Sequence, residues 1–138
     1  MRTLEIEWAE SIKIGRFVDF LIDGKSLRFR LEEHVGNRAT RLGSKMQPIE
    51  SSFRDELLLL AQGGLSSGRV PLYICPLCGD YGCGVVSVRV RRQDGDYVWQ
   101  DFAVEDDDGR YEFIIERIGP FRFEQSAYKR ALSIRTIA

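Results

Sequence analysis

Residues 69–105 read RVPLYICPLCGDYGCGVVSVRVRRQDGDYVWQDFAVE, and the rest of the chain is organised around them. The apolar segments 70–74 and 85–90 have the composition of strands, and a glycine-rich segment with all three cysteines joins them. We call this connection, residues 75–84 (CPLCGDYGCG), the cysteine turn. The pattern predicts two strands of a sheet joined by the cysteine turn.

The segment after residue 90 predicts a second hairpin. A two-residue turn at Asp94-Gly95 would place Val88 opposite Asp101 and so bury an acid. We therefore predict a three-residue loop, 93–95, with Gly95 in a left-handed bulge position, so that Val90 pairs with Val98. On this register the opposite face carries a mixed aromatic and charged group: Arg89, Arg91, Tyr97, Trp99 and Asp101. It is either an ordinary solvated face or a surface that binds a partner, because Tyr, Trp and Arg are enriched at interfaces.

The first quarter of the chain predicts further strands. Residues 4–8 alternate apolar and acidic side chains, as a half-buried strand does. Asp23-Gly24 separates two alternating segments, 16–22 and 25–31, which is a strong signal for a hairpin with a two-residue turn. Its predicted cross-strand pairs are Phe20 with Leu27, Val18 with Phe29, and Asp19 with Arg28.

Two helices are expected. Ser51 or Ser52 can cap a short apolar helix at about 53–62, and a stripe of Phe123, Ala127, Ala131 and Ile134 predicts another at about 124–136. Residues 32–49 lack a clear period and are predicted to be loop or weak strand. The sequence thus predicts an α+β fold, a mostly antiparallel sheet of hairpins with both helices packed on it, in a single domain spanning residues 1–138.

Composition restricts the functional classes. The chain has 138 residues, and its net charge of −1 gives no indication of nucleic-acid binding. It contains no apolar stretch of membrane-spanning length and no signal-peptide pattern at its start, so we expect no membrane partner and a cytoplasmic location. Three cysteines are an odd number, which cannot all pair internally, and this too fits a reducing compartment.

Charge is unevenly distributed along the chain. Residues 94–117 contain nine acids and two arginines, a local net charge of −7. This acidic segment includes the run Asp106, Asp107 and Asp108. Together with the aromatic face, it predicts contact with a basic partner.

The cysteine turn allows three interpretations. Cys75 and Cys78 have the spacing of a zinc knuckle, with Cys83 as a third ligand and Asp80 or His34 as a fourth, but a second Cys-x-x-Cys pair is absent from the sequence. A thiol-redox site would need a helix after the first cysteine, whereas the glycines and the following valine-rich strand argue against one. The favoured interpretation is structural and needs no cofactor, since small buried cysteines and glycines permit a tight reversal.

The segments 74–90, ICPLCGDYGCGVVSVRV, and 119–123, GPFRF, resemble a group of small, mostly uncharacterised bacterial proteins that share a CPxCGDxGCG turn and a late GPFRF segment. The resemblance covers about the last half of the chain. It implies a bacterial cytoplasmic source, and it brings no established reaction and no catalytic residue.

No constellation of nucleophile, base or phosphate loop is visible in the sequence, so we predict that the protein is not an enzyme. The leading hypothesis is a small bacterial binding protein, such as an immunity protein that neutralises a basic toxin domain by protein contact. The alternative is a zinc-binding or thiol-active domain that uses Cys75, Cys78 and Cys83.

Overall fold

The computed structural model describes residues 1–12, 14–44, 50, 52–78 and 80–133. Within these residues, two antiparallel sheets and four short helices form an α+β fold, which confirms the predicted class. The first sheet has the order β1-β2-β3, from β1 (Leu4–Ser11), β2 (Gly15–Ile22) and β3 (Lys25–Ser26). The predicted hairpins therefore lie in two sheets rather than in one.

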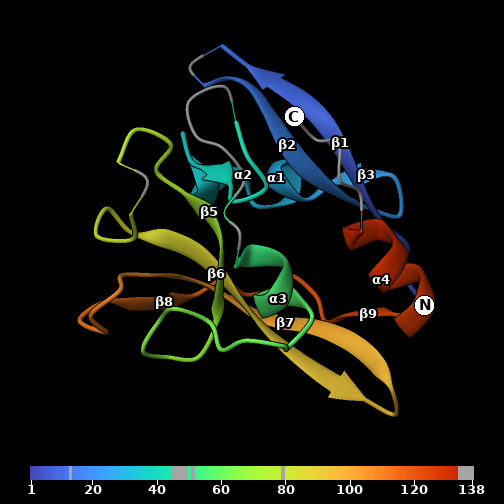
Figure 1. The fold of residues 1–138 in the computed structure, drawn as a ribbon. Coiled ribbons are helices and arrows are strands. Elements are labelled where there is room, and N and C mark those ends of the chain that lie inside the picture. The colour runs from blue at the N-terminus through green and yellow to red at the C-terminus, as the bar shows by residue number, and fades with distance from the viewer. Residues whose placement is uncertain (13, 45–49, 51, 79, 134–138) are drawn as a thin grey trace.

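The second sheet contains most of residues 69–105. Its strands are β4 (Ala39–Thr40), β5 (Val70–Ile74), β6 (Val85–Gln93), β7 (Asp96–Glu105) and β8 (Glu112–Ile114), in that order, and β9 (Phe121–Phe123) also pairs with β7. Figure 1 shows this sheet below the three-stranded one, with α4 (Gln125–Leu132) on one side and the cysteine turn projecting from the other. The cysteine turn thus lies at the end of the β5–β6 hairpin, far from the chain's last helix.

The two sheets share an aromatic core. Trp99 of β7 meets Phe20 of β2 edge to face, with ring centroids 5.3 Å apart. Its indole N–H donates to the Tyr128 hydroxyl (3.0 Å), and this hydroxyl donates to the backbone carbonyl of Leu57 (2.6 Å). The aromatic cluster thus joins both sheets, α3 (Phe53–Leu57) and α4. The indole N–H and the tyrosine hydroxyl are buried in it, and each has a hydrogen-bond partner.

The β2–β3 hairpin is shorter than predicted. Its two-residue turn at Asp23-Gly24 is confirmed, with Ile22 opposite Lys25 and Leu21 opposite Ser26. The strand then ends, because the Ser26 hydroxyl accepts a hydrogen bond from the Phe29 amide (3.0 Å) and caps α1 (Leu27–Arg30). The three predicted cross-strand pairs beyond Ser26 are therefore wrong.

The β6–β7 hairpin corrects the predicted register. Gln93 pairs with Asp96, so the turn has two residues, Asp94 and Gly95, both with positive φ. The extra residue lies instead within β7: Ser87 pairs with Ala103 and Arg89 with Gln100, with Asp101 at a φ of 52°. Asp101 and Phe102 thus stand together opposite Val88, and the bulge leaves Asp101 exposed while Val88 and Phe102 are buried.

The helices differ from prediction in length and in buried face. α3 ends at Leu57 rather than near residue 62, and Leu59 has a positive φ of 59°. Phe123 belongs to β9, and α4 buries Tyr128 and Leu132 rather than the predicted alanine stripe. Ile134 and the rest of the predicted helical end lie outside the described residues. Within the predicted loop the chain forms α2 (Glu32–Val35) and β4.

Among the described residues, no helix is sufficiently long and apolar to cross a bilayer.

Candidate metal centre at the cysteine turn

The cysteine turn brings its three sulfur atoms together. The Sγ atoms of Cys75, Cys78 and Cys83 all lie within 4.8 Å of one another, and this is the one such group of ligand atoms found among the described residues. Cys78 and Cys83 are exposed and Cys75 is half-buried. The favoured structural interpretation assumed small cysteines packed in the interior, and the exposure of two of them contradicts that assumption.

The thiols interact with one another and with the backbone. The Cys78 amide donates to the Cys75 sulfur (3.4 Å), and this hydrogen bond lowers the pKa of the Cys75 thiol by stabilising its thiolate. Cys78 and Cys83 share a hydrogen bond between sulfurs 2.9 Å apart, which raises the pKa of Cys78 to about 12. Without metal the group therefore keeps a proton on Cys78 at neutral pH.

Arg38 holds the turn against α2. Its Nε donates to the carbonyl of Gly84 (2.9 Å) and its Nη2 to that of Cys83 (3.4 Å), while Nη1 donates to the carbonyl of His34 (3.0 Å). Gly84 has a φ of +84°, and a Cβ there would lie 3.1 Å from the Arg38 Nη2. Glycine at this position thus permits both the left-handed backbone and the close approach of the guanidinium.

Tyr81 holds the middle of the turn. Its hydroxyl donates to Glu50 (3.2 Å), which accepts a hydrogen bond from the buried guanidinium of Arg41 (2.8 Å). Arg41 also makes two hydrogen bonds with Glu56, at 2.9 and 2.6 Å, and its guanidinium lies 5.4 Å from the Tyr81 ring centroid. The position of the sulfur atoms is consequently supported at two points, Arg38 and Tyr81.

The structure assembles neither predicted fourth ligand with the cysteines. The Asp80 carboxylate accepts the Gly82 amide (3.0 Å), and the His34 ring packs 5.6 Å from that of Phe113. Neither side chain joins the group of sulfur atoms within 4.8 Å. The part of the chain that is described thus supplies three ligands.

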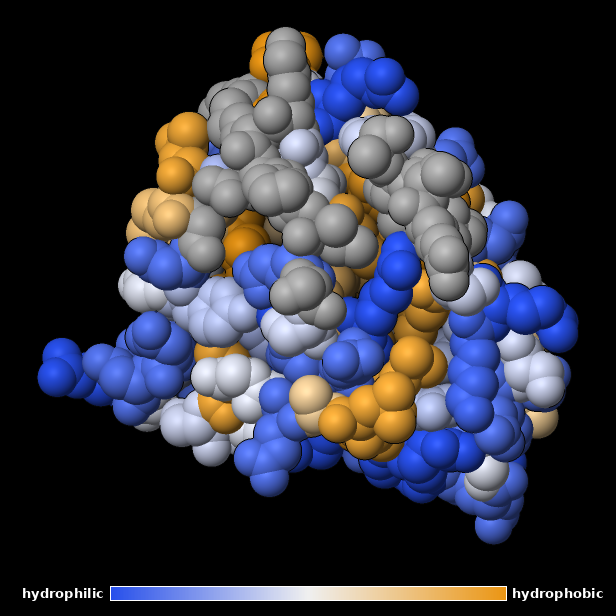
Figure 2. All heavy atoms as spheres, in the orientation of Figure 1, coloured by the Kyte–Doolittle hydropathy of each residue, from blue (hydrophilic) through white to orange (hydrophobic). Residues whose placement is uncertain are grey.

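A hollow adjoins two of the cysteines, Cys75 and Cys83. It has a volume of about 400 Å³, and Cys75, Cys83, Arg38, Asn37, Ile14, Pro76 and Leu77 line it. Leu77 is 77% exposed, and Figure 2 shows hydrophobic surface on the side of the molecule where the cysteine turn lies. The sulfur atoms are therefore accessible to a molecule of modest size.

The predicted partner surface is only partly present. Tyr97 and Trp99 are 2% and 0% exposed, because the two-residue turn at Asp94-Gly95 places them on the core face. Arg89 lies 3.9 Å from Asp101, Arg91 donates to Gln100 (2.9 Å), and Asp107 and Asp108 are exposed. Asp106, which is half-buried, accepts the Arg110 amide (3.0 Å) within its own turn.

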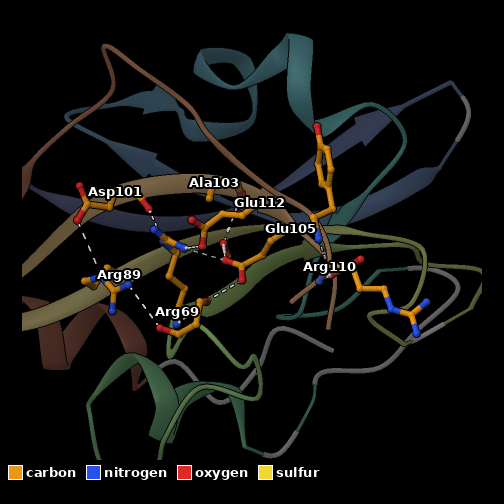
Figure 3. Close-up of polar contacts among 11 residues, drawn as sticks. Arg69, Arg89, Asp101, Ala103, Glu105, Arg110 and Glu112 are labelled. Atoms are coloured by element: carbon orange, nitrogen blue, oxygen red, sulfur yellow. Dashed lines mark hydrogen bonds and ion pairs between the residues drawn. The ribbon is translucent and has the colours of Figure 1, made fainter. Parts of the chain in front are cut away.

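Much of the acidic segment forms internal ion pairs. The buried carboxylate of Glu105 accepts hydrogen bonds from Ser67 (2.6 Å) and Ser87 (2.5 Å) and lies 3.3 Å from Arg69. Arg69, which immediately precedes β5, also pairs with Glu112 of β8 at 2.6 Å, and Figure 3 shows Arg69, Glu105 and Glu112 converging. Neither this network nor the one at Arg41 could be predicted from the sequence, since no local pattern shows which arginine a distant glutamate meets.

Comparisons with protein-family models, with curated proteins and with solved structures found no match. The resemblance stated for the cysteine turn and the GPFRF segment therefore stays a prediction.

Proposed function

We propose that the protein binds a metal ion that prefers sulfur ligands, Zn²⁺ in the first instance, through Cys75, Cys78 and Cys83. The observation that supports this most strongly is the convergence of all three sulfur atoms within 4.8 Å. Zinc–thiolate bonds of about 2.3 Å in a tetrahedron place sulfur atoms roughly 3.8 Å apart. To bind zinc, the sulfur atoms of Cys78 and Cys83, which are 2.9 Å apart, would have to move only modestly away from each other.

The geometry favours metal binding over the two other interpretations of the turn. Packing does not account for two exposed cysteines. In a thiol-redox motif the nucleophilic cysteine begins a helix whose dipole lowers its pKa, whereas strand β6 follows this turn. Thiolate ligands select Zn²⁺ and Cu⁺ over Mg²⁺ and Ca²⁺, which prefer oxygen.

Titration with Co²⁺, a coloured substitute for Zn²⁺, tests the proposal. Reduced, chelator-treated protein should bind one Co²⁺ per chain with a thiolate-to-cobalt charge-transfer band, and Zn²⁺ should abolish that band by competition. Cys75→Ser, Cys78→Ser and Cys83→Ser should each weaken binding. Asp80→Asn is the matched control, because its carboxylate already accepts the Gly82 amide. Absence of the band from the reduced wild type would refute the function.

A second candidate is the binding of a basic protein segment at the edge strand β8. This strand ends the path of the six-stranded sheet, and Tyr111, Phe113 and Ile114 there are 54%, 46% and 40% exposed. Exposed acids, Asp107 and Glu116, lie on either side of it in the sequence. An extended basic partner strand, such as one from a toxin domain, would complement both its apolar side chains and its charge.

The salt dependence of association, measured for the wild type and for two substitutions, tests this second candidate. A basic partner should associate more slowly as salt rises, and Phe113→Asp should abolish binding while Asp107→Ala should only slow association. Association that is independent of both salt and Phe113 would rule out β8 as the contact.

A further inference from the structure

We propose that the metal centre is open and exchangeable, and that its fourth ligand is a small anionic thiol seated in the hollow beside Cys75 and Cys83. This inference rests on the proposed function. Its first support is the number of ligands: three cysteine sulfur atoms converge among the described residues, whereas Zn²⁺ takes four ligands. Zinc sites with three protein ligands keep the fourth position for a water or a substrate.

The hollow has the size and lining of a small-molecule site. Its volume of about 400 Å³ lies at the small end of the 300–1,000 Å³ usual for ligand pockets. Ile14, Pro76 and Leu77 supply apolar wall, and Asn37 and Arg38 supply polar groups. Two of the three cysteines, Cys75 and Cys83, also line the hollow, so a molecule held there lies beside the proposed metal ligands.

The chemistry of the site selects an anionic thiol. A centre that already carries three thiolates favours a further sulfur ligand over a hard oxygen ligand. The Arg38 Nη2 makes a long hydrogen bond of 3.4 Å to the Cys83 carbonyl, and this nitrogen carries a second hydrogen that a carboxylate can accept. One end of the ligand thus binds the metal and the other meets the guanidinium.

Exposure makes such a centre exchangeable. Cys78 and Cys83 are exposed, so an incoming thiol can approach the metal without opening the core. A closed structural zinc site, in contrast, has four protein ligands and no position for a substrate. The protein would therefore accept and release its metal through a thiol ligand.

Reduced glutathione, added to the Co²⁺-loaded full chain, is the test. Its thiolate should raise the charge-transfer intensity by roughly one third, as expected for four thiolates instead of three. S-methylglutathione keeps the carboxylates but blocks the sulfur, and it should leave the band unchanged. Filling the hollow by Leu77→Trp should weaken the glutathione response about tenfold. Leu60→Trp, the same change at a leucine that is 74% exposed and outside the hollow's lining, is the matched control.

The outcomes separate this inference from the function on which it rests. If Co²⁺ gives no charge-transfer band, the metal function itself fails. If the band forms but glutathione leaves it unchanged, or S-methylglutathione changes it equally, the function stands and the open site is refuted. Removal of cobalt into the filtrate by glutathione, without an intermediate of higher intensity, would also overturn the inference.

Discussion

Two contrasting polar clusters lie close together at the beginning of strand β6, where the cysteine turn leads into Val85 and Val85 pairs with Glu105. In the cluster at Arg69 and Glu105, the buried carboxylate has hydrogen bonds from two serines and an ion pair with the guanidinium (Figure 3). In the cysteine turn, two of three thiols are exposed and the sulfur atoms meet beside a hollow. One cluster satisfies its polar groups within the protein, and the other presents them outward.

This difference suits one cluster to stabilising the fold and the other to the ligand binding that we propose. A buried charge that loses its partner is strongly destabilising, so the network of Arg69 and Glu105 has little freedom to react. The exposed thiols contribute little to the core, and under the proposal their convergence serves to bind a ligand. The following changes test this division, from the largest expected effect to the smallest.

Glu105→Ala should lower the free energy of unfolding by about 2–3 kcal/mol, because Ser67 and Ser87 lose their acceptor and the buried Arg69 keeps only its ion pair with the half-exposed Glu112. Urea denaturation of the metal-free protein measures the loss. Asp107→Ala removes an exposed acid from the same segment and should change stability by less than about 0.5 kcal/mol. Equal effects from both changes would show that the network does not stabilise the fold.

Cys83→Ser should show the opposite pattern. We expect Zn²⁺ affinity to fall at least about a hundredfold, more than removal of a group that only supports a ligand usually costs. The stability of the metal-free protein should change by less than about 0.5 kcal/mol, because the side chain is exposed. Competition with a chelator of known affinity gives the first quantity and urea denaturation the second. A large loss of metal-free stability would place Cys83 with the structural cluster.

Metal affinity should rise with pH. The pKa of Cys78 is about 12, so at pH 7–9 its thiol is protonated and must release that proton to bind the metal. Affinity should therefore increase about tenfold per pH unit for each proton released. Zn²⁺ titrations at several pH values, with buffer of equal chelating strength, measure the slope. A flat profile over pH 7–9 would show that the Cys78 thiolate is not a ligand.

Tyr81→Phe should have the smallest effect. It removes the hydrogen bond to Glu50 that supports the middle of the cysteine turn, at a cost of about 1 kcal/mol. Because the ring stays in place, the metal site should keep its one-to-one stoichiometry with slightly weaker affinity. Thermal unfolding with and without Zn²⁺ tests this. If the substitution abolished metal binding, the hydroxyl rather than the ring would be what positions the sulfur atoms.

Local pattern was sufficient for some features. Strands β5 and β6 and the turn at Asp23-Gly24 follow from apolar composition and turn chemistry, which act over a few residues. The proximity of Cys75 and Cys78 likewise follows from their spacing within a turn. These features need no knowledge of distant segments.

Other features depend on contacts between distant segments. The bulge at Asp101 could not be located from the sequence. A bulge at the turn and one inside the strand both place Phe102 and Val104 on the same face, and they differ only for the residues between the turn and Asp101. The burial of Tyr97 and Trp99 depends on that choice. After Ser26 the chain forms α1 instead of the predicted strand, because the Ser26 side chain caps the helix. The alternation of apolar residues around Ser26 favoured a strand and gave no sign of this cap.

The sequence by itself determined an antiparallel α+β protein with its cysteines gathered in one connection, since periodicity and turn residues encode such local geometry. Only the tertiary structure decided that three sulfur atoms converge beside a hollow, and that Glu105 is neutralised inside by Arg69. Both depend on pairings across tens of residues, of Arg38 with Gly84 and of Arg69 with Glu105. The energy of such pairings comes from burial and from hydrogen-bond geometry, which exist only once the sheets have packed together.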